Sequence, residues 1–230
     1  SAAEVAAGTV TLTLTTNDPA GPCDTVSDNV VITINPQAVA NAGVDQTICA
    51  GSTVTLNGSV GGGATTGTWT GGSGSFTPDP TALNATYTPS AAEVSAGTVT
   101  LTLTTNDPDG PCGPTTDQVT ITINPQATVN AGTDQTICEE STVTLAGSVG
   151  GGATSGTWSG GGGTFSPNAN TLNAVYTPSA TEISNGSVTL TLTTNDPAGP
   201  CEAVSDQVTI TINLLAEVSA GPDQTICSNE

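Results

Sequence analysis

The stretch TVTLTLTTNDPDGPC, at Thr98 to Cys112, begins as a strict alternation of apolar residues with threonine. This period of two predicts a strand with one buried face. The alternation ends at Asn106-Asp107-Pro108, where the residues favour a turn. A second alternating run, QVTITI, follows at 118–123. Two such runs joined by a loop rich in Gly and Pro predict a β-hairpin.

This stretch occurs three times, ending at Cys23, Cys112 and Cys201, so the repeat is 112 − 23 = 89 residues and again 201 − 112 = 89. A unit of this length suits one β-sandwich of about seven short strands. The Asn-Pro or Asn-Leu step after each hairpin divides the chain into four segments. They are 1–36 (the last hairpin of a repeat), 37–125 and 126–214 (complete repeats) and 215–230 (the first strand of another). Because the chain begins in mid-repeat, we expect it to be an excerpt.

Inside 37–125 the sequence predicts more strands around a small core. The strands are expected at 38–48 with a glycine kink, 53–56, 67–70 and 84–88. Gly61 to Gly63 is expected to be a loop, and Ser90 to cap a helical turn. The expected core residues are Val54, Leu56, Trp69, Leu83, Tyr87, Val99, Leu101, Leu103, Val119, Ile121 and Ile123, with counterparts 89 positions later. The predicted fold is therefore all-β: tandem sandwiches in an elongated rod.

The charge of the chain excludes several functions. It has 20 acidic residues and no Lys, Arg or His, which gives a net charge of −20. Nucleic acids and anionic membrane surfaces are poor partners because both need cationic side chains. No apolar run is long enough to span a bilayer. A Ser, Thr or Cys nucleophile would lack a His or Lys base, so we expect no enzyme activity.

The segments NAGVDQTICAGSTVTLNGS (Asn41 to Ser59) and NAGTDQTICEESTVTLAGS (Asn130 to Ser148) resemble the opening of PKD-like, immunoglobulin-like domains. The whole 89-residue unit resembles the tandem repeats of very long cell-surface adhesins from Bacteroidetes-type bacteria. The resemblance implies a secreted, surface-attached stalk or filament whose partners are neighbouring repeats and other copies in a filament. It carries over no catalytic residue.

Two ligand sites are candidates. Calcium suits the acidic loops after the first hairpin strand, at Asn106, Asp107 and Asp109 and at Asn195 and Asp196, with Asn17 and Asp18 as the earlier copy. The competing interpretation is plain turn chemistry. The outward threonines Thr100, Thr102, Thr120 and Thr122 could form a hydroxyl face that binds glycan or ice. Thr is also simply a good strand residue.

The cysteines allow two pairing schemes. Paired cysteines in a chain without Lys or His suit an oxidising, extracellular setting better than a zinc site. Pairing within a repeat would join Cys49 to Cys112 and Cys138 to Cys201. The strands, however, place Cys49 at the bottom of its sandwich and Cys112 at the top, about 20 Å apart. A disulfide needs Cα atoms within about 7 Å.

Stacking the repeats end to end removes this difficulty. The bottom turn of one repeat then meets the top loop of the next. We therefore expect an interdomain disulfide between Cys49 and Cys201, with the remaining cysteines pairing beyond this chain. The expected function is a spacer that gives length and stiffness, and the alternative is a ligand-binding module.

Overall fold

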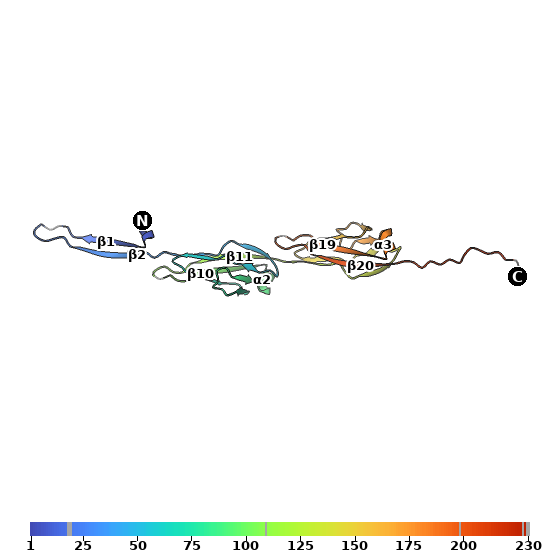
Figure 1. Cartoon of the computed structure of the whole chain (residues 1–230), viewed down its shortest axis with the longest axis horizontal. Helices are drawn as coiled ribbons and strands as arrows, with labels where there is room; N and C mark the ends of the chain where they lie inside the picture. The colour runs from blue at the N-terminus through green and yellow to red at the C-terminus, as the bar shows by residue number, and fades with distance from the viewer. Residues whose placement is uncertain (18–19, 109, 198, 227, 229–230) are drawn as a thin grey trace. The chain divides into compact units, whose positions relative to one another are not determined.

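A computed structural model describes residues 1–17, 20–108, 110–197, 199–226 and 228. It divides into two compact units, Ser1–Asn124 and Pro125–Glu230. Within these described ranges the protein is all-β apart from three short helices, α1 (Ala2–Ala7), α2 (Ala91–Ala96) and α3 (Ala180–Asn185). Each helix precedes the first strand of a hairpin (Figure 1).

The first unit contains the N-terminal hairpin and one complete repeat. The hairpin consists of β1 (Thr9–Thr15) and β2 (Ser27–Thr33), paired antiparallel. The strands of the complete repeat are β3 (Ala38–Asn41), β4 (Gln46–Cys49), β5 (Val54–Thr55), β6 (Ser59–Gly62), β7 (Gly67–Thr70), β8 (Ser75–Thr77), β9 (Thr86–Thr88), β10 (Thr98–Thr105) and β11 (Thr116–Asn124). They form a four-stranded sheet in the order β4-β11-β10-β7, a three-stranded sheet β5-β9-β8 and a pair β3-β6.

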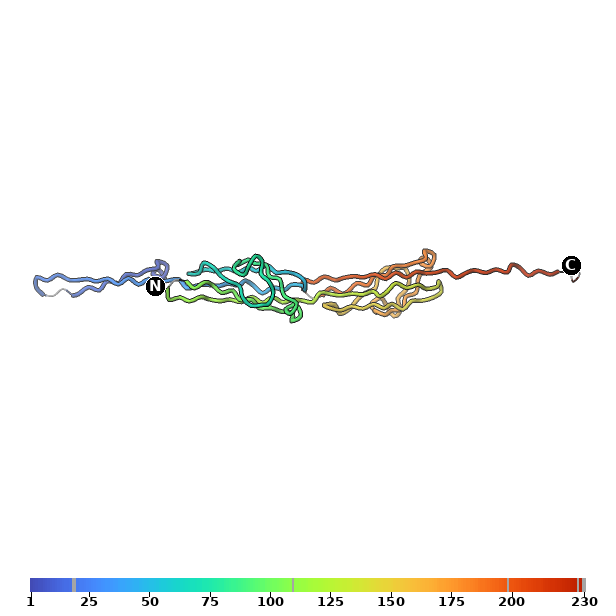
Figure 2. Tube along the Cα trace, turned by 90° about the horizontal axis from the view of Figure 1, so that it is seen from below, coloured from blue at the N-terminus to red at the C-terminus, as the bar shows by residue number. Residues whose placement is uncertain are grey.

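The second unit repeats this arrangement. Its strands are β12 (Ala127–Asn130), β13 (Gln135–Cys138), β14 (Val143–Thr144), β15 (Ser148–Gly151), β16 (Gly156–Ser159), β17 (Thr164–Ser166), β18 (Val175–Thr177), β19 (Ser187–Thr194) and β20 (Ser205–Asn213). The sheets are β13-β20-β19-β16, β14-β18-β17 and β12-β15. The tube in Figure 2 follows the chain through both repeats.

The core of each repeat lies where the inner faces of the two sheets meet. Every residue expected in the core of 37–125 is buried except Leu83, which is half-buried against it. Trp69 can be buried at low cost because its indole Nε1, the one polar atom of the ring, donates to Leu83 O at 3.2 Å. Trp158 makes the same bond to Leu172 O at 3.1 Å. The alternating pattern therefore identified the core correctly.

The structure corrects two local expectations. Gly61 and Gly62 belong to strand β6, which pairs with β3, and only Gly63 lies in the loop. Strand β8 was missed because its three residues are too few to show a period. The described residues of 215–230 form no strand, and the assignment of this segment to the next repeat stays a prediction. In the complete repeat the corresponding strands, β3 and β4, pair with β6 and β11.

Candidate functional site: the ends and outer face of the repeat

The two cysteines of a repeat lie at opposite ends of its longest strand. Cys49 ends β4 and stands opposite Asn124, the last residue of β11, in a parallel pair. Cys112 lies in the loop that precedes β11. Because β11 runs from Thr116 to Asn124, it separates the two cysteines by its full length, as the sequence suggested. In the second unit Cys138 stands opposite Asn213 in the same way.

The bonding states of the cysteines differ. Cys49 and Cys201 are each in a disulfide bond. Cys23, Cys112 and Cys138 carry free thiols, and Cys227 is outside the described residues. The alternative of pairing within a repeat, Cys49 with Cys112 and Cys138 with Cys201, is therefore not what the structure contains, because one member of each pair is free.

The top of the first complete repeat receives the last residues of the preceding hairpin. The Sγ of Cys112 donates to Asn35 O at 3.6 Å, and Gly110 lies directly against the Asn35 side chain. A Cβ on Gly63 would overlap Pro36 O and come within 3.1 Å of Pro108. Glycine at these positions therefore lets the Asn-Pro step sit close against two loops. Gly152 lies in the same way against Pro125 O and Pro197.

One asparagine holds the two top loops together. Asn106 Oδ1 accepts hydrogen bonds from Thr65 N and Thr66 N, both 2.9 Å, and Asn106 N donates to Thr66 O. Asn195 accepts from Thr154 N at 2.9 Å and Ser155 N at 2.8 Å. Both lone pairs of each Oδ1 are thus used by backbone N–H groups.

This geometry narrows the calcium hypothesis. Asn106 and Asn195 serve as loop organisers, so their Oδ1 atoms are not free to bind a cation. Asp107 and Asp196 are exposed, while Asp18 and Asp109 lie outside the described residues. Within the described ranges, no group of three His, Cys, Asp or Glu side chains could hold a metal ion.

The outer face of the four-stranded sheet is covered with hydroxyl groups. Thr100 stands opposite Thr120, and Thr98 opposite Thr122, on β10 and β11. Thr102 accepts a hydrogen bond from Gln118 Nε2 at 3.3 Å. The face extends further than the sequence indicated, because Thr47 of β4 pairs with Thr122, and Thr68 and Thr70 of β7 pair with Thr104 and Thr102.

In each repeat a buried glutamate carboxylate joins the start of the short helix to the core and to a nearby loop. It was not identified from the sequence. Glu93 Oε1 accepts from Tyr87 Oη at 2.7 Å and Ser73 N at 2.6 Å, and Oε2 accepts from Ser90 N at 2.7 Å. Ser90 is the N-cap of α2 and, with Glu93, forms a capping box. The signal that could have found it is the spacing Ser-x-x-Glu, at Ser90 and Glu93 and again at Ser179 and Glu182.

Within this network the pKa of the glutamate is lowered and the pKa of the tyrosine is raised. Burial desolvates Glu93 and opposes its charge, but hydrogen bonds from Ser90, Ser73 and Tyr87 outweigh that cost and lower its pKa. Burial and the neighbouring Glu93 raise the pKa of Tyr87 to about 12. Tyr176 and Glu182 behave alike. Neutral tyrosine and charged glutamate are the forms that fit together, which indicates a structural role.

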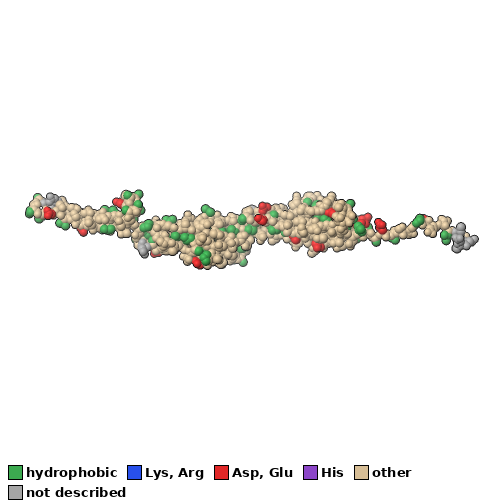
Figure 3. Space-filling model, viewed as in Figure 1, with side chains coloured by type: hydrophobic (Ala, Val, Ile, Leu, Met, Phe, Trp, Pro, Cys, Tyr) green, Lys and Arg blue, Asp and Glu red, His purple; other side chains and the backbone are tan. Residues whose placement is uncertain are grey.

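No cationic side chain offsets the negative charge of the acidic residues. The face in Figure 3 carries acidic side chains in red and no blue or purple ones, as a sequence without Lys, Arg and His requires. Among the described residues no helix has both the length and the apolar character needed to cross a membrane.

Comparison with known proteins identifies the fold. No family model matches the chain, and no curated protein matches it. Among solved structures, the insect immune protein hemolin is similar over 88% of this chain and 56% of its own, at 12% identity and a TM-score of 0.50. A mouse clustered protocadherin (PcdhgC3 EC1-3) is similar over 89% of this chain and 76% of its own, at 14% identity and a TM-score of 0.43. The chain thus spans little more than half of hemolin. Its repeats have an immunoglobulin-like β-sandwich fold.

Proposed function

We propose that this chain is a structural repeat segment of an extracellular adhesin stalk or surface filament, non-enzymatic, whose repeats supply length and stiffness. The main support for this proposal is that the two sandwiches are packed in the same way. Each buried core residue from Val54 to Ile123 has a counterpart 89 positions later that is buried or half-buried in the same place. One packing solution used repeatedly is what a spacer requires.

The proposed domains are 37–125 and 126–214, flanked by the hairpin 1–36 and the segment 215–230. Their support is that each complete repeat has its own hydrophobic core and its own pair of sheets. The linkers between repeats are short, and Pro restricts the backbone at each Asn-Pro step. From such joints we expect an elongated rod. The PKD-like, bacterial-surface resemblance of the sequence and hemolin's association with homophilic adhesion agree with this role.

We further propose that Cys49 pairs with Cys201 across the joint between repeats. The contact between the N-terminal hairpin and the first complete repeat provides a template. There Cys112 contacts Asn35, and adding 89 to each residue number maps this contact onto Cys201 and Asn124. Asn124 is the register partner of Cys49. The same translation would bring Cys201 beside Cys49, and the bonded state of these two cysteines supports the proposed pair. Such a bond would resist bending and pulling at the joint.

The alternative function is a ligand-binding module that uses the hydroxyl face for glycan or ice. The regular spacing of Thr47, Thr100, Thr102, Thr120 and Thr122 on one sheet favours it. The two functions differ in one experiment. Changing Thr100, Thr102 and Thr120 to glutamate should abolish ligand binding by a module, whereas a spacer should keep its shape and lose only some stability.

The test of the spacer is small-angle scattering of the whole chain, first oxidised and then reduced. A spacer should give the long, narrow distance distribution of a rod, and the distribution should broaden when the disulfide is reduced. A compact particle in both states would refute the proposal. The Thr variants, measured in parallel against immobilised glycans and in an ice-recrystallisation assay, decide between the two functions.

A further inference from the structure

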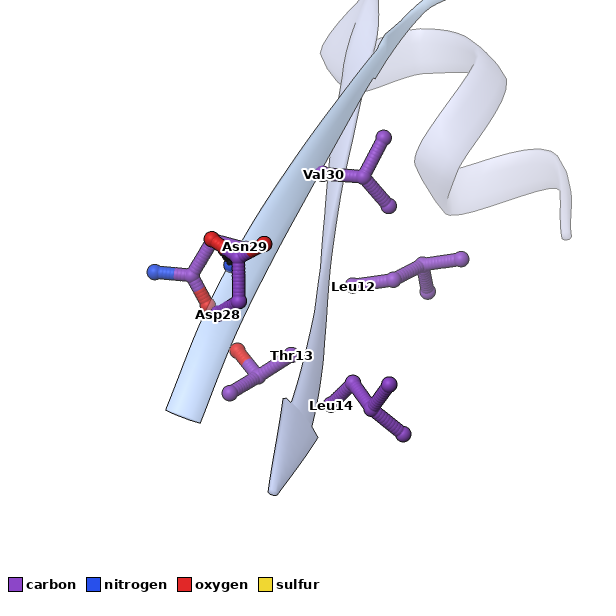
Figure 4. A pocket seen from close by; sticks show the side chains of 6 residues that line it. All are labelled: Leu12, Thr13, Leu14, Asp28, Asn29 and Val30. Carbon is purple, nitrogen blue, oxygen red and sulfur yellow. Dashed lines mark hydrogen bonds between the residues drawn. The ribbon is translucent and has the colours of Figure 1, made fainter. Parts of the chain in front are cut away.

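The N-terminal hairpin exposes a face that is buried in the complete repeat. Leu12 and Leu14 are 52% and 80% exposed, whereas their counterparts Leu101 and Leu103 are 0% exposed. Figure 4 shows Leu12, Leu14 and Val30 pointing to the same side of the hairpin. A hollow at this place is lined by Leu12, Thr13, Leu14, Asp28, Asn29 and Val30. Exposed apolar surface of this kind marks an interaction site.

The complete repeat shows what this face accommodates. Residues 1–36 and 90–125 differ at positions 6, 20, 24, 25, 26, 27, 29 and 31, so 36 − 8 = 28 of 36 residues are identical. In the complete repeat the same face packs in one core with side chains that precede the hairpin in sequence. They are Ala42, Ile48, Val54, Leu56, Trp69, Ala85 and Tyr87. All of them come from residues 37–89.

A polar group on the face indicates the same occupant. Asp28 stands opposite Leu14 in the register of the hairpin. Its counterpart Asp117 accepts a hydrogen bond of 2.8 Å from Ala42 N, a backbone amide at the end of β3. In the described part of the chain Asp28 accepts a hydrogen bond from its neighbour Asn29 N and from no other group. The carboxylate is thus placed to receive a backbone N–H from an incoming segment.

The strand edges agree with this reading. In the complete repeat β10 pairs with β7 on one side and β11 pairs with β4 on the other. The sheet of β1 and β2 has only these two strands in the described residues. Both outer edges can therefore accept a strand, antiparallel beside β1 and parallel beside β2.

We propose that the apolar face of β1 and β2 is a docking site for a polypeptide segment with the sequence pattern of residues 37–89. The segment would complete an immunoglobulin-like sandwich on the hairpin. Leu12, Leu14, Val30 and Ile32 bind its apolar face, Asp28 binds the amide equivalent to Ala42 N, and the two edges take strands equivalent to β4 and β7. This site is independent of the spacer function, because it requires only that the hairpin and the segment fold together.

The experiment adds a synthetic peptide of residues 37–89, with Cys49→Ser, to the intact 230-residue chain in about 150 mM salt, which screens the acidic charges. Hydrogen exchange of the amides in 9–15 is expected to slow by about tenfold or more, with 1:1 stoichiometry by calorimetry. Leu12→Asp with Leu14→Asp should abolish the protection. Thr11→Asp, an exposed residue on the opposite face of β1 that does not line the hollow, should leave it unchanged, and Asp28→Ala should weaken binding.

Three outcomes would overturn the proposal. The first is that the amides in 9–15 show no slowing of hydrogen exchange in two experiments. In one the peptide is added, and in the other the same 53-residue sequence is fused directly before Ser1. Another is peptide binding that is insensitive to the Leu12 and Leu14 changes, which would place the peptide elsewhere, as in exchange with residues 37–89 of the complete repeat. The third is protection without peptide that grows with chain concentration, since the occupant would then be a second copy of the chain.

Discussion

The hydroxyl of Tyr87 donates a hydrogen bond of 2.7 Å to Glu93 Oε1, and both side chains are buried. The phenol lies in the core against Phe76, with ring centroids 4.8 Å apart, while the carboxylate caps α2 and holds the loop at Ser73. This pair connects the core, the helix and the β7–β8 loop. Tyr176 and Glu182 form the same link in the second repeat.

Glu93→Gln is expected to destabilise the first repeat by about 1–3 kcal/mol. The amide of glutamine can accept through only one atom, so its NH2 group would face a backbone N–H of Ser90 or Ser73. The measurement is urea unfolding combined with hydrogen exchange, which reports the two repeats separately. Glu140→Gln, at an exposed position, is the matched control and should change nothing measurable. An equal effect of both substitutions would show that charge alone is responsible.

The pH dependence of stability follows from the same network. The pKa of Glu93 and Glu182 lies below the ordinary 4.5 in the folded state, so their contribution is complete above pH 4.5 and is lost as the pH falls through the folded value. Asp117 and Asp206 act in the same direction below 3.8, because Ala42 N and Ala131 N donate to them. The pKa of each tyrosine is raised from 10.0 to about 12, so its contribution is lost between these values.

Thermal melting as a function of pH should therefore show a plateau that falls on the acid side below about pH 4.5 and on the alkaline side above about pH 10. The double variant Glu93→Gln with Glu182→Gln should have a flatter acid limb. An acid limb that is unchanged in this variant would mean that other carboxylates control acid unfolding.

Gly58→Ala is expected to destabilise the first repeat by about 1–3 kcal/mol through overpacking. A Cβ at this position would lie 2.6 Å from Trp69 Cζ2 and 3.0 Å from Leu83 O. Gly61→Ala is the matched control, since a Cβ there meets nothing within 4 Å, and it should be neutral or slightly stabilising. Tryptophan fluorescence during urea unfolding measures both. The idea is wrong if Gly58→Ala is as well tolerated as Gly61→Ala.

Calcium binding to the top loop stays a prediction, and only the carboxylates of that loop remain as side-chain ligands. With the Oδ1 of Asn106 taken by Thr65 N and Thr66 N, few oxygens remain, so we expect a weak site with a dissociation constant of about 10⁻⁴–10⁻³ M. Calorimetry should then detect binding that Asp107→Asn reduces. The second repeat, with Ala198 where the first has Asp109, should bind more weakly. Unchanged melting temperatures with calcium and with chelator would reject the site.

The sequence predicted the fold well because strand burial follows a local rule. The period of two in β10 and β11 placed Leu101, Leu103 and Ile121 inside and the threonines outside, and each repeat confirmed the others. Strands without such a period were not predicted. Strand β8 is only three residues long. The glycines of β6 were predicted to form a loop, but they form a strand that pairs with β3.

The candidate sites were less predictable, because a side chain's partner comes from distant parts of the chain. Asn106 looked like a cation ligand, yet its oxygen is taken by two amides 40 and 41 residues away. Glu93 lies in the helical turn that Ser90 was expected to cap, yet its carboxylate also accepts a hydrogen bond from Ser73 N, 20 residues away. The opposite placement of Cys49 and Cys112 could be predicted because it requires only strand order and length.

The proposed Cys49–Cys201 bond makes a sharp chemical prediction. Digestion of the non-reduced chain with a protease that cleaves at acidic residues, since no Lys or Arg is available, should release Cys49 and Cys201 in one disulfide-linked peptide pair. Cys49→Ser should expose one additional reactive thiol, at Cys201, whereas Cys112→Ser should remove a thiol that is already free. Neither change touches a core residue, so each sandwich should unfold as before, while scattering of Cys49→Ser should show a broader distance distribution from a looser joint. Recovery of Cys49 linked to Cys112 would refute the staple and with it the proposed source of stiffness.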